Sequence, residues 1–212
     1  MLNAKGRTTR RSGEAAPARN PERTRARLLE TAAGEIYRSG FQGTGLDRIL
    51  AGAEVTKGAL YHYFDSKEAL GYAILDEVVF GITQKKWLEP LAASIDPIDT
   101  LIEIVRGTSL LPENVEGGCP LNNLSQEMSP LDEGFRRRAA RIFRDWRDAI
   151  ATALRDGQKC GQVRKDIDAT ESATFFVALY EGYISLAKNA QDPAVLRAGL
   201  KTMTRHLETL RG

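Results

Sequence analysis

The stretch from Leu46 to Phe64, LDRILAGAEVTKGALYHYF, constrains the fold of this 212-residue chain more than any other segment. Its apolar spacing predicts two short helices separated by a tight turn. The second helix carries two small residues near its start, followed by two tyrosines and a histidine. A short helix with that surface is suited to the major groove of double-stranded DNA, where base edges can be read.

Helical spacing of apolar residues recurs along the rest of the chain, whereas few segments alternate with a period of two. The sequence therefore predicts an all-α fold of about nine helices. We expect a three-helix module over residues 21–68 and a larger helical body over residues 69–212. Residues 1–20 are basic and nearly free of large apolar side chains, so we expect a disordered arm there.

Local signals set the boundaries of the helix that should connect the module to the body. Asp65 and Glu68 have the spacing of a capping box, which indicates a helix start. We expect this helix to continue towards Trp87 and to end before Pro90. Further along, residues 113–118 are expected to form a loop.

The last two helices, expected over about residues 169–189 and after Pro193, carry more apolar surface than one partner helix can bury. They predict a four-helix interface with a second copy of the chain. The alternative is that all of this surface packs into the core of one subunit. The stripe on the final helix consists of Leu196, Leu200, Met203, Leu207 and Leu210.

Charge and composition narrow the class of protein. Residues 1–70 hold 12 basic and 8 acidic side chains, whereas the remainder holds 18 and 20. The basic excess coincides with the DNA-reading segment, as phosphate contacts require, although a solvated basic tail would give the same count. No apolar run approaches the roughly 18 residues of a membrane span. Two cysteines make no disulfide framework and fit a reducing compartment, so we expect a cytoplasmic protein without a membrane partner.

Residues 44–51, TGLDRILA, are followed by residues 55–64, VTKGALYHYF, and then by Ser66-Lys67-Glu68. This pattern resembles the helix-turn-helix of the TetR family of bacterial repressors, and the specific match covers about residues 24–80. The resemblance implies a DNA-binding domain over residues 21–68 and a ligand-binding and dimerisation domain over residues 69–212. It also implies a homodimer on a palindromic operator. An effector would then change the separation of the two recognition helices, which must stand roughly 34–36 Å apart.

The residues matching the family's DNA-reading segment have suitable chemistry. The Thr44 hydroxyl can contact a phosphate, Lys57 can reach a phosphate or a guanine edge, and Lys67 can hold a phosphate at a helix N-terminus. Within or beside a helix-turn-helix that runs from Gly45 to Phe64, the full set of DNA-contact candidates is Thr44, Gly45, Arg48, Lys57, Gly58, Ala59, Tyr61, His62 and Lys67. Leu60, Tyr63 and Phe64 are expected to pack inward.

Two positions depart from the family pattern. Glu54 stands where the turn glycine is usual, so it is expected to accept a left-handed backbone at a cost of about 1 kcal/mol. Gly45 stands where a Ser or Thr cap is usual, and glycine is only slightly worse as an N-cap. Neither change is expected to remove DNA binding.

The segment GGCPLNNL around Cys119 resembles the Gly-Cys-x-Leu-x-Asn-Leu segment of one subgroup of the family. Some members of that subgroup respond to electrophiles or oxidants through a cysteine. Cys119 is expected near a helix N-terminus, where the helix dipole favours the reactive thiolate. The alternative is that Cys119 is a small buried apolar residue. Cys160 is expected to be exposed and to have no functional role.

A conventional effector pocket is expected between the long helices and the connecting helix, although each candidate could equally be ordinary core. A flat or partly aromatic effector would suit the side chains available, and no cluster of charges in the body names a ligand. The candidates for the pocket lining are Trp87, Leu124, Met128, Phe143, Trp146, Phe176 and Tyr180.

Two other classes of function fit the sequence less well. An enzyme with Cys119 as nucleophile would need a partnered base, and neither His62 in the reading helix nor His206 near the chain end is well placed. No metal-ligand cluster, phosphate-binding glycine loop or nucleophile elbow occurs, so neither an enzyme nor a cofactor is expected. A basic protein acting on membrane surfaces would bind lipid vesicles without preferring any DNA sequence.

Overall fold

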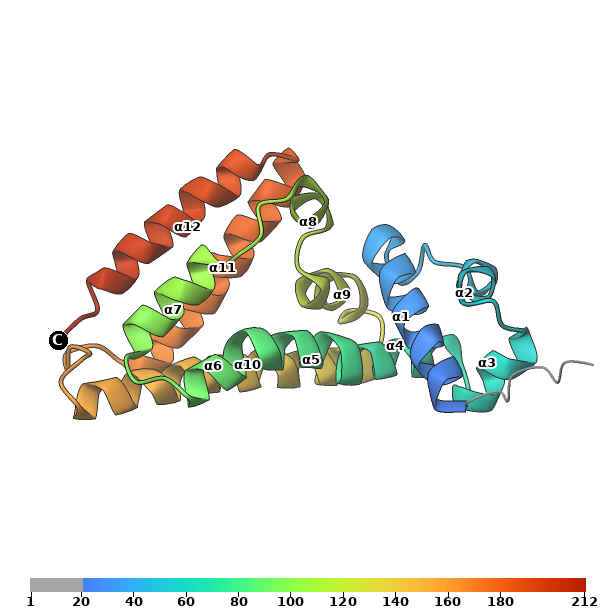
Figure 1. The fold of residues 1–212 in the computed structure, drawn as a ribbon, viewed down its shortest axis with the longest axis horizontal. Helices are drawn as coiled ribbons and strands as arrows, with labels where there is room; N and C mark the ends of the chain where they lie inside the picture. The colour runs from blue at the N-terminus through green and yellow to red at the C-terminus, as the bar shows by residue number, and fades with distance from the viewer. Residues whose placement is uncertain (1–20) are drawn as a thin grey trace, which may run out of the picture.

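The computed structural model describes residues 21–212 and confirms the all-helical fold class. Apart from one isolated β-bridge between Val163 and Arg211, the regular structure of the described residues is helical. A small N-terminal module stands at one end of a larger body (Figure 1). The basic arm expected for residues 1–20 lies outside the described residues. The module consists of α1 (Pro21–Ser39), α2 (Leu46–Ala53) and α3 (Lys57–Tyr63).

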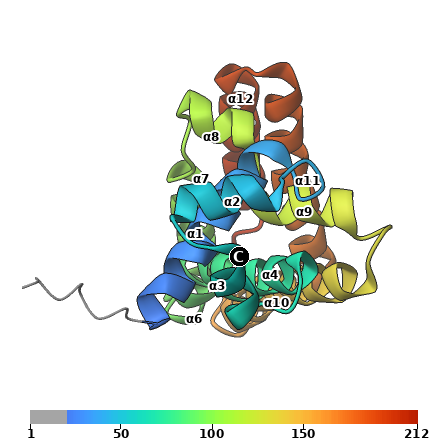
Figure 2. The same cartoon turned by 90° about the vertical axis from the view of Figure 1, so that its right-hand side faces the viewer.

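Two turns with left-handed backbone let the three helices of the module pack around a small apolar core. Gly40 ends α1 with a φ of 76°, and Glu54 caps α2 with a φ of 52°, so the expected left-handed backbone at Glu54 is confirmed. Leu28, Ile49 and Leu60 contribute one fully buried side chain from each helix. Figure 2, which views the molecule from the side of this module, shows α1, α2 and α3 in front of the body.

The connecting helix is a continuous rod with two π-helical turns; it starts within the expected segment 65–68, but its capping residue and its end differ from the expectation. Its cap is Ser66, whose hydroxyl oxygen accepts a hydrogen bond of 3.0 Å from the Ala69 N–H, and not Asp65. Pro90 lies inside the rod, directly after the π-helical turn Gln84–Leu88, where the wider turn relieves the clash of the proline ring with the preceding turn. In chain order the rod consists of α4 (Lys67–Ala73), η1 (Ile74–Val79), α5 (Phe80–Thr83), η2 (Gln84–Leu88) and α6 (Glu89–Ala92).

The body packs the remaining helices around this rod. The segment expected to be a loop contains α8 instead, because Pro112 occupies the first helical turn, where a missing N–H costs no helical hydrogen bond. Figure 1 shows α10 running alongside the rod while α11 and α12 lean away from it. The helices of the body are α7 (Pro97–Arg106), α8 (Pro112–Gly117), α9 (Pro120–Met128), α10 (Glu133–Lys159), α11 (Ala169–Ala190) and α12 (Pro193–Glu208).

Two apolar clusters hold the molecule together. One joins α1–α3 and the start of the rod to α9 and the first half of α10. The other joins the end of the rod to α7, the second half of α10, α11 and α12, and Phe143 packs against both clusters. Because α9 shares a core with the DNA-binding module, a movement of α9 must disturb the packing of that module.

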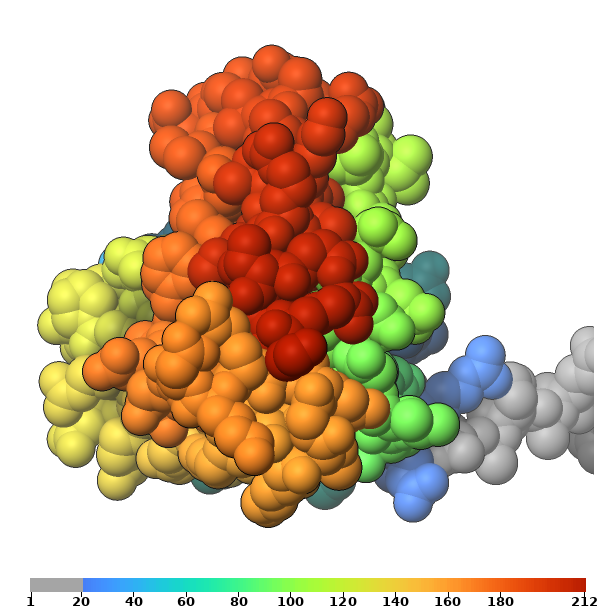
Figure 3. Space-filling view, turned by 90° about the vertical axis from the view of Figure 1, so that its left-hand side faces the viewer, coloured from blue at the N-terminus to red at the C-terminus, as the bar shows by residue number. Residues whose placement is uncertain are grey.

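The apolar stripe of α12 is buried within its own subunit, so for this stripe the alternative of intramolecular packing is correct. Backbone hydrogen bonds from Arg164 to Leu210 and from Gly212 to Gln162 tie the chain end to the segment after α10. Figure 3 shows this end of the molecule, with the last residues in dark red against that segment in orange. The large apolar side chains left exposed on α11 are Phe175 and Leu186.

Candidate DNA-reading surface and interior pocket

The sequence of α3 buries one side of this helix and presents the other to solvent. Its N-cap is Thr56, whose hydroxyl oxygen accepts a hydrogen bond of 3.2 Å from the Ala59 N–H. As expected, Leu60 and Phe64 are buried and Tyr63 is partly buried. The DNA-contact candidates on α3 that remain exposed are Lys57, Gly58, Tyr61 and His62.

These exposed residues offer hydrogen-bond donors beside a position that allows close approach. The Tyr61 side chain is 42% exposed, and the Lys57 ammonium lies 6.0 Å from the centre of its ring. A methyl group added at Gly58 would meet no atom closer than 4.0 Å, so the helix surface is open there. Ala59 is partly buried, and Gly45 is the exposed N-cap of α2. The surface therefore has the chemistry needed to contact DNA, and its contacts with DNA remain a proposal.

Three other candidates are engaged within the protein. Thr44 is fully buried and its hydroxyl donates a hydrogen bond of 2.6 Å to the Gly40 carbonyl, so in this structure the hydroxyl faces the protein interior. Arg48 forms an ion pair of 2.8 Å with Glu35 on α1. The Lys67 ammonium donates a hydrogen bond of 2.6 Å to a backbone carbonyl of the α1–α2 turn, which leaves its other N–H groups for a phosphate.

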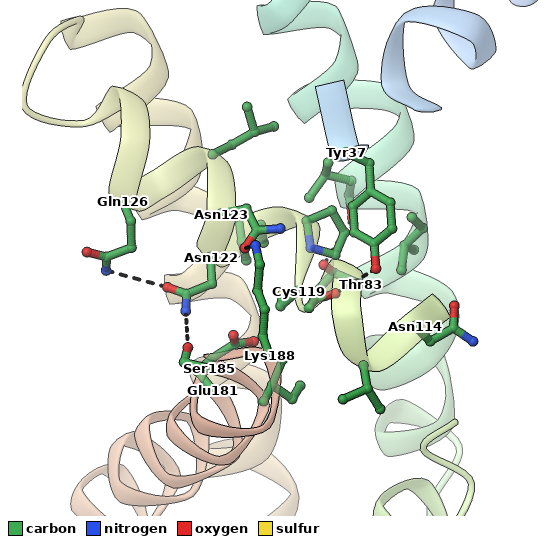
Figure 4. A pocket seen from close by; sticks show the side chains of 18 of the residues that line it. Tyr37, Thr83, Asn114, Cys119, Asn122, Asn123, Gln126, Glu181, Ser185 and Lys188 are labelled. Carbon is green, nitrogen blue, oxygen red and sulfur yellow. Dashed lines mark hydrogen bonds between the residues drawn. The ribbon is translucent and has the colours of Figure 1, made fainter. Parts of the chain in front are cut away.

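A cavity of about 1190 Å³ lies between α1, the rod, the α8–α9 segment and α11 (Figure 4). Among the expected lining residues, Trp87, Leu124, Trp146 and Tyr180 do line it, together with Cys119. Met128, Phe143 and Phe176 do not line it, although they pack in the same apolar clusters as the residues that do.

Cys119 is the N-cap of α9, as expected, but its chemistry differs from the expectation. Part of the residue reaches the surface, whereas its thiol is surrounded by protein. Burial raises the pKa of this thiol far above its usual value, and the nearby Glu181 carboxylate raises it further. The backbone N–H groups of Asn122 and Leu121 oppose this shift without cancelling it. Burial and Glu181 therefore oppose the thiolate that the helix N-terminus is expected to favour.

Glu181 is the charged residue that the sequence reading missed in this cavity. Its side chain is only 7% exposed, and both carboxylate oxygens are buried without a hydrogen-bond partner. Burial raises its pKa to about 7, and interactions with Cys119 and Lys86 partly oppose that shift. In Figure 4 the carboxylate points from α11 towards the start of α9.

Lys86 supplies a positive charge close to this carboxylate. Its ammonium donates a hydrogen bond of 2.5 Å to the Tyr180 hydroxyl and lies 5.4 Å from the centre of the Trp87 ring. Burial lowers the pKa of Lys86, whereas interactions with Cys119 and Glu181 raise it. The fold thus brings Lys86 and Glu181, which are far apart in the chain, to the same part of the cavity, although the sequence pattern did not indicate this.

Helix α9 connects the cavity to the DNA-binding module at both of its ends. The Tyr37 hydroxyl on α1 donates a hydrogen bond of 2.9 Å to the Gly118 carbonyl, next to Cys119. At the other end, the Glu127 carboxylate accepts hydrogen bonds of 2.8 Å from the backbone N–H groups of Phe41 and Gln42. These contacts fix the turn between α1 and α2 to the helix that forms one wall of the cavity.

Two further properties concern the described part of the chain. Within residues 21–212, no three or more His, Cys, Asp or Glu side chains are grouped so that they could hold a metal ion. No helix in the same range combines the length and apolar character that crossing a membrane requires.

The fold and the two sites define a helix-turn-helix regulator with an interior pocket, and comparison with known proteins identifies its family. Residues 28–74 match the family described as bacterial regulatory proteins, tetR family. Residues 97–203 match the tetracyclin repressor-like C-terminal domain. The chain belongs to the TetR family. It is a DNA-binding transcriptional regulator and not an enzyme.

Individual relatives agree with this assignment. The chain is 33% identical to the HTH-type transcriptional repressor DhaR of Mycobacterium sp. (strain GP1) over 169 residues, which cover 79% of this chain and 82% of that protein. The crystal structure of regulatory protein TetR from Rhodobacter sphaeroides matches with a TM-score of 0.76 and 27% identity, covering 86% of this chain and 98% of that one. The reduced form of Escherichia coli NemR matches with a TM-score of 0.75 and 27% identity, covering 89% and 97%.

Proposed function

We propose that this regulator binds a palindromic operator as a homodimer and releases it when a small molecule occupies the interior cavity. The observation that carries the proposal is the position of α9, which lines the cavity and also bonds to the turn before α2. A ligand that displaces α9 alters the support of that turn, and with it the orientation of α2 and α3. The cytoplasm is the proposed place of action, because the operator DNA lies there.

The proposed DNA contacts come from the exposed side of α3. Tyr61 and His62 donate to phosphates or touch bases, Lys57 reaches a phosphate or a guanine edge, and Gly58 lets the helix approach. Lys67 reaches a phosphate from the start of the rod through the N–H groups that its internal bond leaves free. A backbone N–H near Gly45, at the start of α2, can add a further phosphate contact.

The proposed dimer contact uses the outer side of α11 and the adjoining surface of α12. Phe175 and Leu186 are 51% and 58% exposed, and both lie on the same side of α11 as Gly182. A side chain added at Gly182 would meet no atom within 4 Å, so a second helix has room to approach there. The Phe175 ring also lies 5.1 Å from the ring of His206 on α12. Burying large exposed apolar side chains against a second copy is favourable, and a twofold axis satisfies both copies at once.

An electrophile or oxidant is the second candidate effector. Cys119 favours it because the residue lines the cavity at the start of α9, where a covalent change would alter the packing of that helix. The Gly-Cys-x-Leu-x-Asn-Leu pattern around it supports membership of the subgroup with that behaviour. The raised pKa of the thiol favours a non-covalent effector as the first candidate, since a protonated thiol is a poor nucleophile.

A gel-shift titration with the DNA upstream of the protein's own gene tests the proposal. The expected result is retardation of that fragment but not of a scrambled fragment of equal length, with binding that weakens steeply as salt rises. The scrambled fragment measures sequence-independent attraction to phosphates. Equal retardation of both fragments, or of neither in any salt, would contradict operator binding.

A further inference from the structure

The Glu181 carboxylate is a hydrogen-bond acceptor in the cavity wall that the folded chain leaves unused. Both of its oxygens are buried without a partner, although the residue is only 7% exposed. A buried polar group without a partner is costly, so proteins retain such groups where they serve another purpose. Glu181 belongs to the same cavity wall as Cys119, which ties the unpartnered oxygens to the place where an effector is expected.

The polar groups around Glu181 already have partners inside the protein. From the rod, the Lys86 ammonium is bonded to the Tyr180 hydroxyl, which lies 3.0 Å from the hydroxyl oxygen of Thr108. From α11 itself, the Lys188 ammonium donates a hydrogen bond of 2.8 Å to the side-chain oxygen of Asn123. From α1, the Tyr37 hydroxyl bonds to the Gly118 carbonyl. The Cys119 thiol is close enough to lower the pKa of Glu181 as a weak hydrogen-bond donor, yet neither carboxylate oxygen has a partner that meets full hydrogen-bond geometry.

The charges at this end of the cavity disfavour an ionic ligand. An ammonium group would be attracted by Glu181 but repelled by Lys86 and Lys188, and an anion would be attracted by the lysines but repelled by Glu181, so neither ion finds a purely attractive site. The raised pKa of Glu181, about 7, agrees with a site in which charge is poorly compensated. A neutral O–H group avoids both costs, because it can donate to the carboxylate without bringing charge into the cavity.

The rest of the wall fits an apolar molecule. Trp87, Tyr180 and Ile184 border the cavity near Glu181, and Trp146 adds a second indole ring. The Trp146 indole N–H is also buried without a partner, so a hydroxyl oxygen or another acceptor on the ligand has a donor available in the same wall. A few placed polar groups in a mostly apolar wall are typical of small-molecule sites.

We propose that the effector is a neutral, mostly apolar alcohol or phenol whose hydroxyl group donates a hydrogen bond to Glu181. This inference rests on the proposed function, since it names the class of molecule that the proposed effector cavity takes. It assigns Glu181 as the residue that selects the ligand by its O–H group.

Four probes built on one apolar cage test the assignment. Adamantan-1-ylmethanol carries the hydroxyl, its methyl ether masks the donor, adamantan-1-ylmethanamine is a cation, and adamantane-1-carboxylate is an anion. Both tryptophans of the chain, Trp87 and Trp146, line the cavity, so intrinsic fluorescence reports occupancy while the probes stay transparent. The alcohol is expected to bind at least about tenfold more tightly than the ether, and more tightly than either ion.

Two variants separate recognition from structure. Glu181→Met keeps the volume and removes the acceptor, so the preference for the alcohol over the ether should fall to about onefold. Glu181→Gln keeps one acceptor oxygen and should retain part of the preference. Without ligand, Glu181→Met should melt at or above the temperature of the parent protein, because no internal hydrogen bond is lost.

Several results would overturn the assignment. They are equal binding of alcohol and ether, tighter binding of the amine or the carboxylate, no binding of the alcohol, and an unchanged preference in Glu181→Met. A markedly lower melting temperature of Glu181→Met without ligand would show that the carboxylate supports the fold.

Titrating operator DNA in the same samples distinguishes a failure of this inference from a failure of the proposed function. Operator binding without a preference for the alcohol over the ether would contradict this inference alone. Alcohol binding without operator binding would contradict the proposed function alone.

Discussion

The Tyr37 hydroxyl group on α1 donates a hydrogen bond of 2.9 Å to the carbonyl oxygen of Gly118, the residue before Cys119. This bond joins the first helix of the DNA-binding module to the segment that opens the cavity wall. The packing there is close, because a side chain added at Gly117 would stand 2.1 Å from the same hydroxyl oxygen. A ligand that moves the start of α9 must therefore act on α1 directly.

The contact between the other end of α9 and the DNA-binding module can be removed by substituting Glu127. Glu127→Ala leaves the backbone N–H groups of Phe41 and Gln42 without their acceptor, which should cost roughly 1–2 kcal/mol of unfolding free energy. We expect operator binding to persist while release by a cavity ligand weakens, as measured by anisotropy of labelled operator. Glu116→Ala, which removes an exposed carboxylate on α8, is the matched control. Full ligand response in Glu127→Ala would show that the signal does not pass through this contact.

Removing the Tyr61 side chain should weaken operator binding by about 1–3 kcal/mol and leave the dimer intact. Lys57→Ala should lower affinity for all DNA sequences and reduce the salt dependence by about one phosphate contact. Lys67→Ala should also weaken binding, with a loss of stability because its bond to the Phe41 carbonyl disappears. Lys201→Ala, exposed on α12, controls for the loss of a positive charge. Unchanged operator affinity in all three variants would place the reading surface elsewhere.

Thr44 separates a structural role from a DNA contact. Thr44→Val removes the buried hydroxyl bond to Gly40 and should lower the unfolding free energy by roughly 1–2 kcal/mol in a urea titration. The salt dependence of operator binding should not change, because the hydroxyl does not reach solvent. A salt slope reduced by about one phosphate would instead restore the contact expected from the sequence.

The two cysteines should differ in reactivity. At pH 7.5, iodoacetamide is expected to label the exposed Cys160 well before Cys119, whose thiol burial keeps protonated. Peptide mass spectrometry over time measures both rates in one sample, and Cys119→Ser confirms the assignment. Faster labelling of Cys119 would show that the thiol ionises more easily than its surroundings indicate.

The pH dependence of stability follows from Glu181. Its pKa rises from an ordinary value of 4.5 to about 7 on folding, so the folded protein holds the proton more tightly than the unfolded chain. The parent protein should therefore lose stability relative to Glu181→Gln as pH rises from about 4.5 to 7, by at most roughly 3 kcal/mol. Urea unfolding at pH 5 and pH 8 measures the difference. A gap that stays constant between these pH values would mean that Glu181 is not raised in pKa by the fold.

Much of the DNA-binding module could be predicted from the sequence because its signals are local. The inward positions of Leu60 and Phe64 follow from helical spacing over a few residues, and the left-handed backbone at Glu54 follows from its place in the turn. Local signals gave a wrong prediction where two neighbouring residues could each cap the same helix. Ser66 rather than Asp65 became the cap, since the start of the rod was one residue later than the capping-box pattern indicated.

The cavity could be predicted only in part, because its chemistry is built from distant segments. Trp87 and Tyr180 could be predicted because they are aromatic residues on long helices. The proximity of Lys86 to Glu181 could not be predicted, since it depends on how the rod and α11 pack against each other. The same limit explains Cys119, whose position at a helix start was predictable while the burial of its thiol was not.

Hydroxyl-radical footprinting of the dimer on its operator tests the central claim most directly. Two recognition helices held on a twofold axis should protect two patches centred about 10–10.5 base pairs apart, or a multiple of that spacing, on DNA with a palindromic sequence. Tyr61→Ala at the same protein concentration should remove both patches together. A single protected patch, or uniform protection along the fragment, would contradict a twofold helix-turn-helix reader.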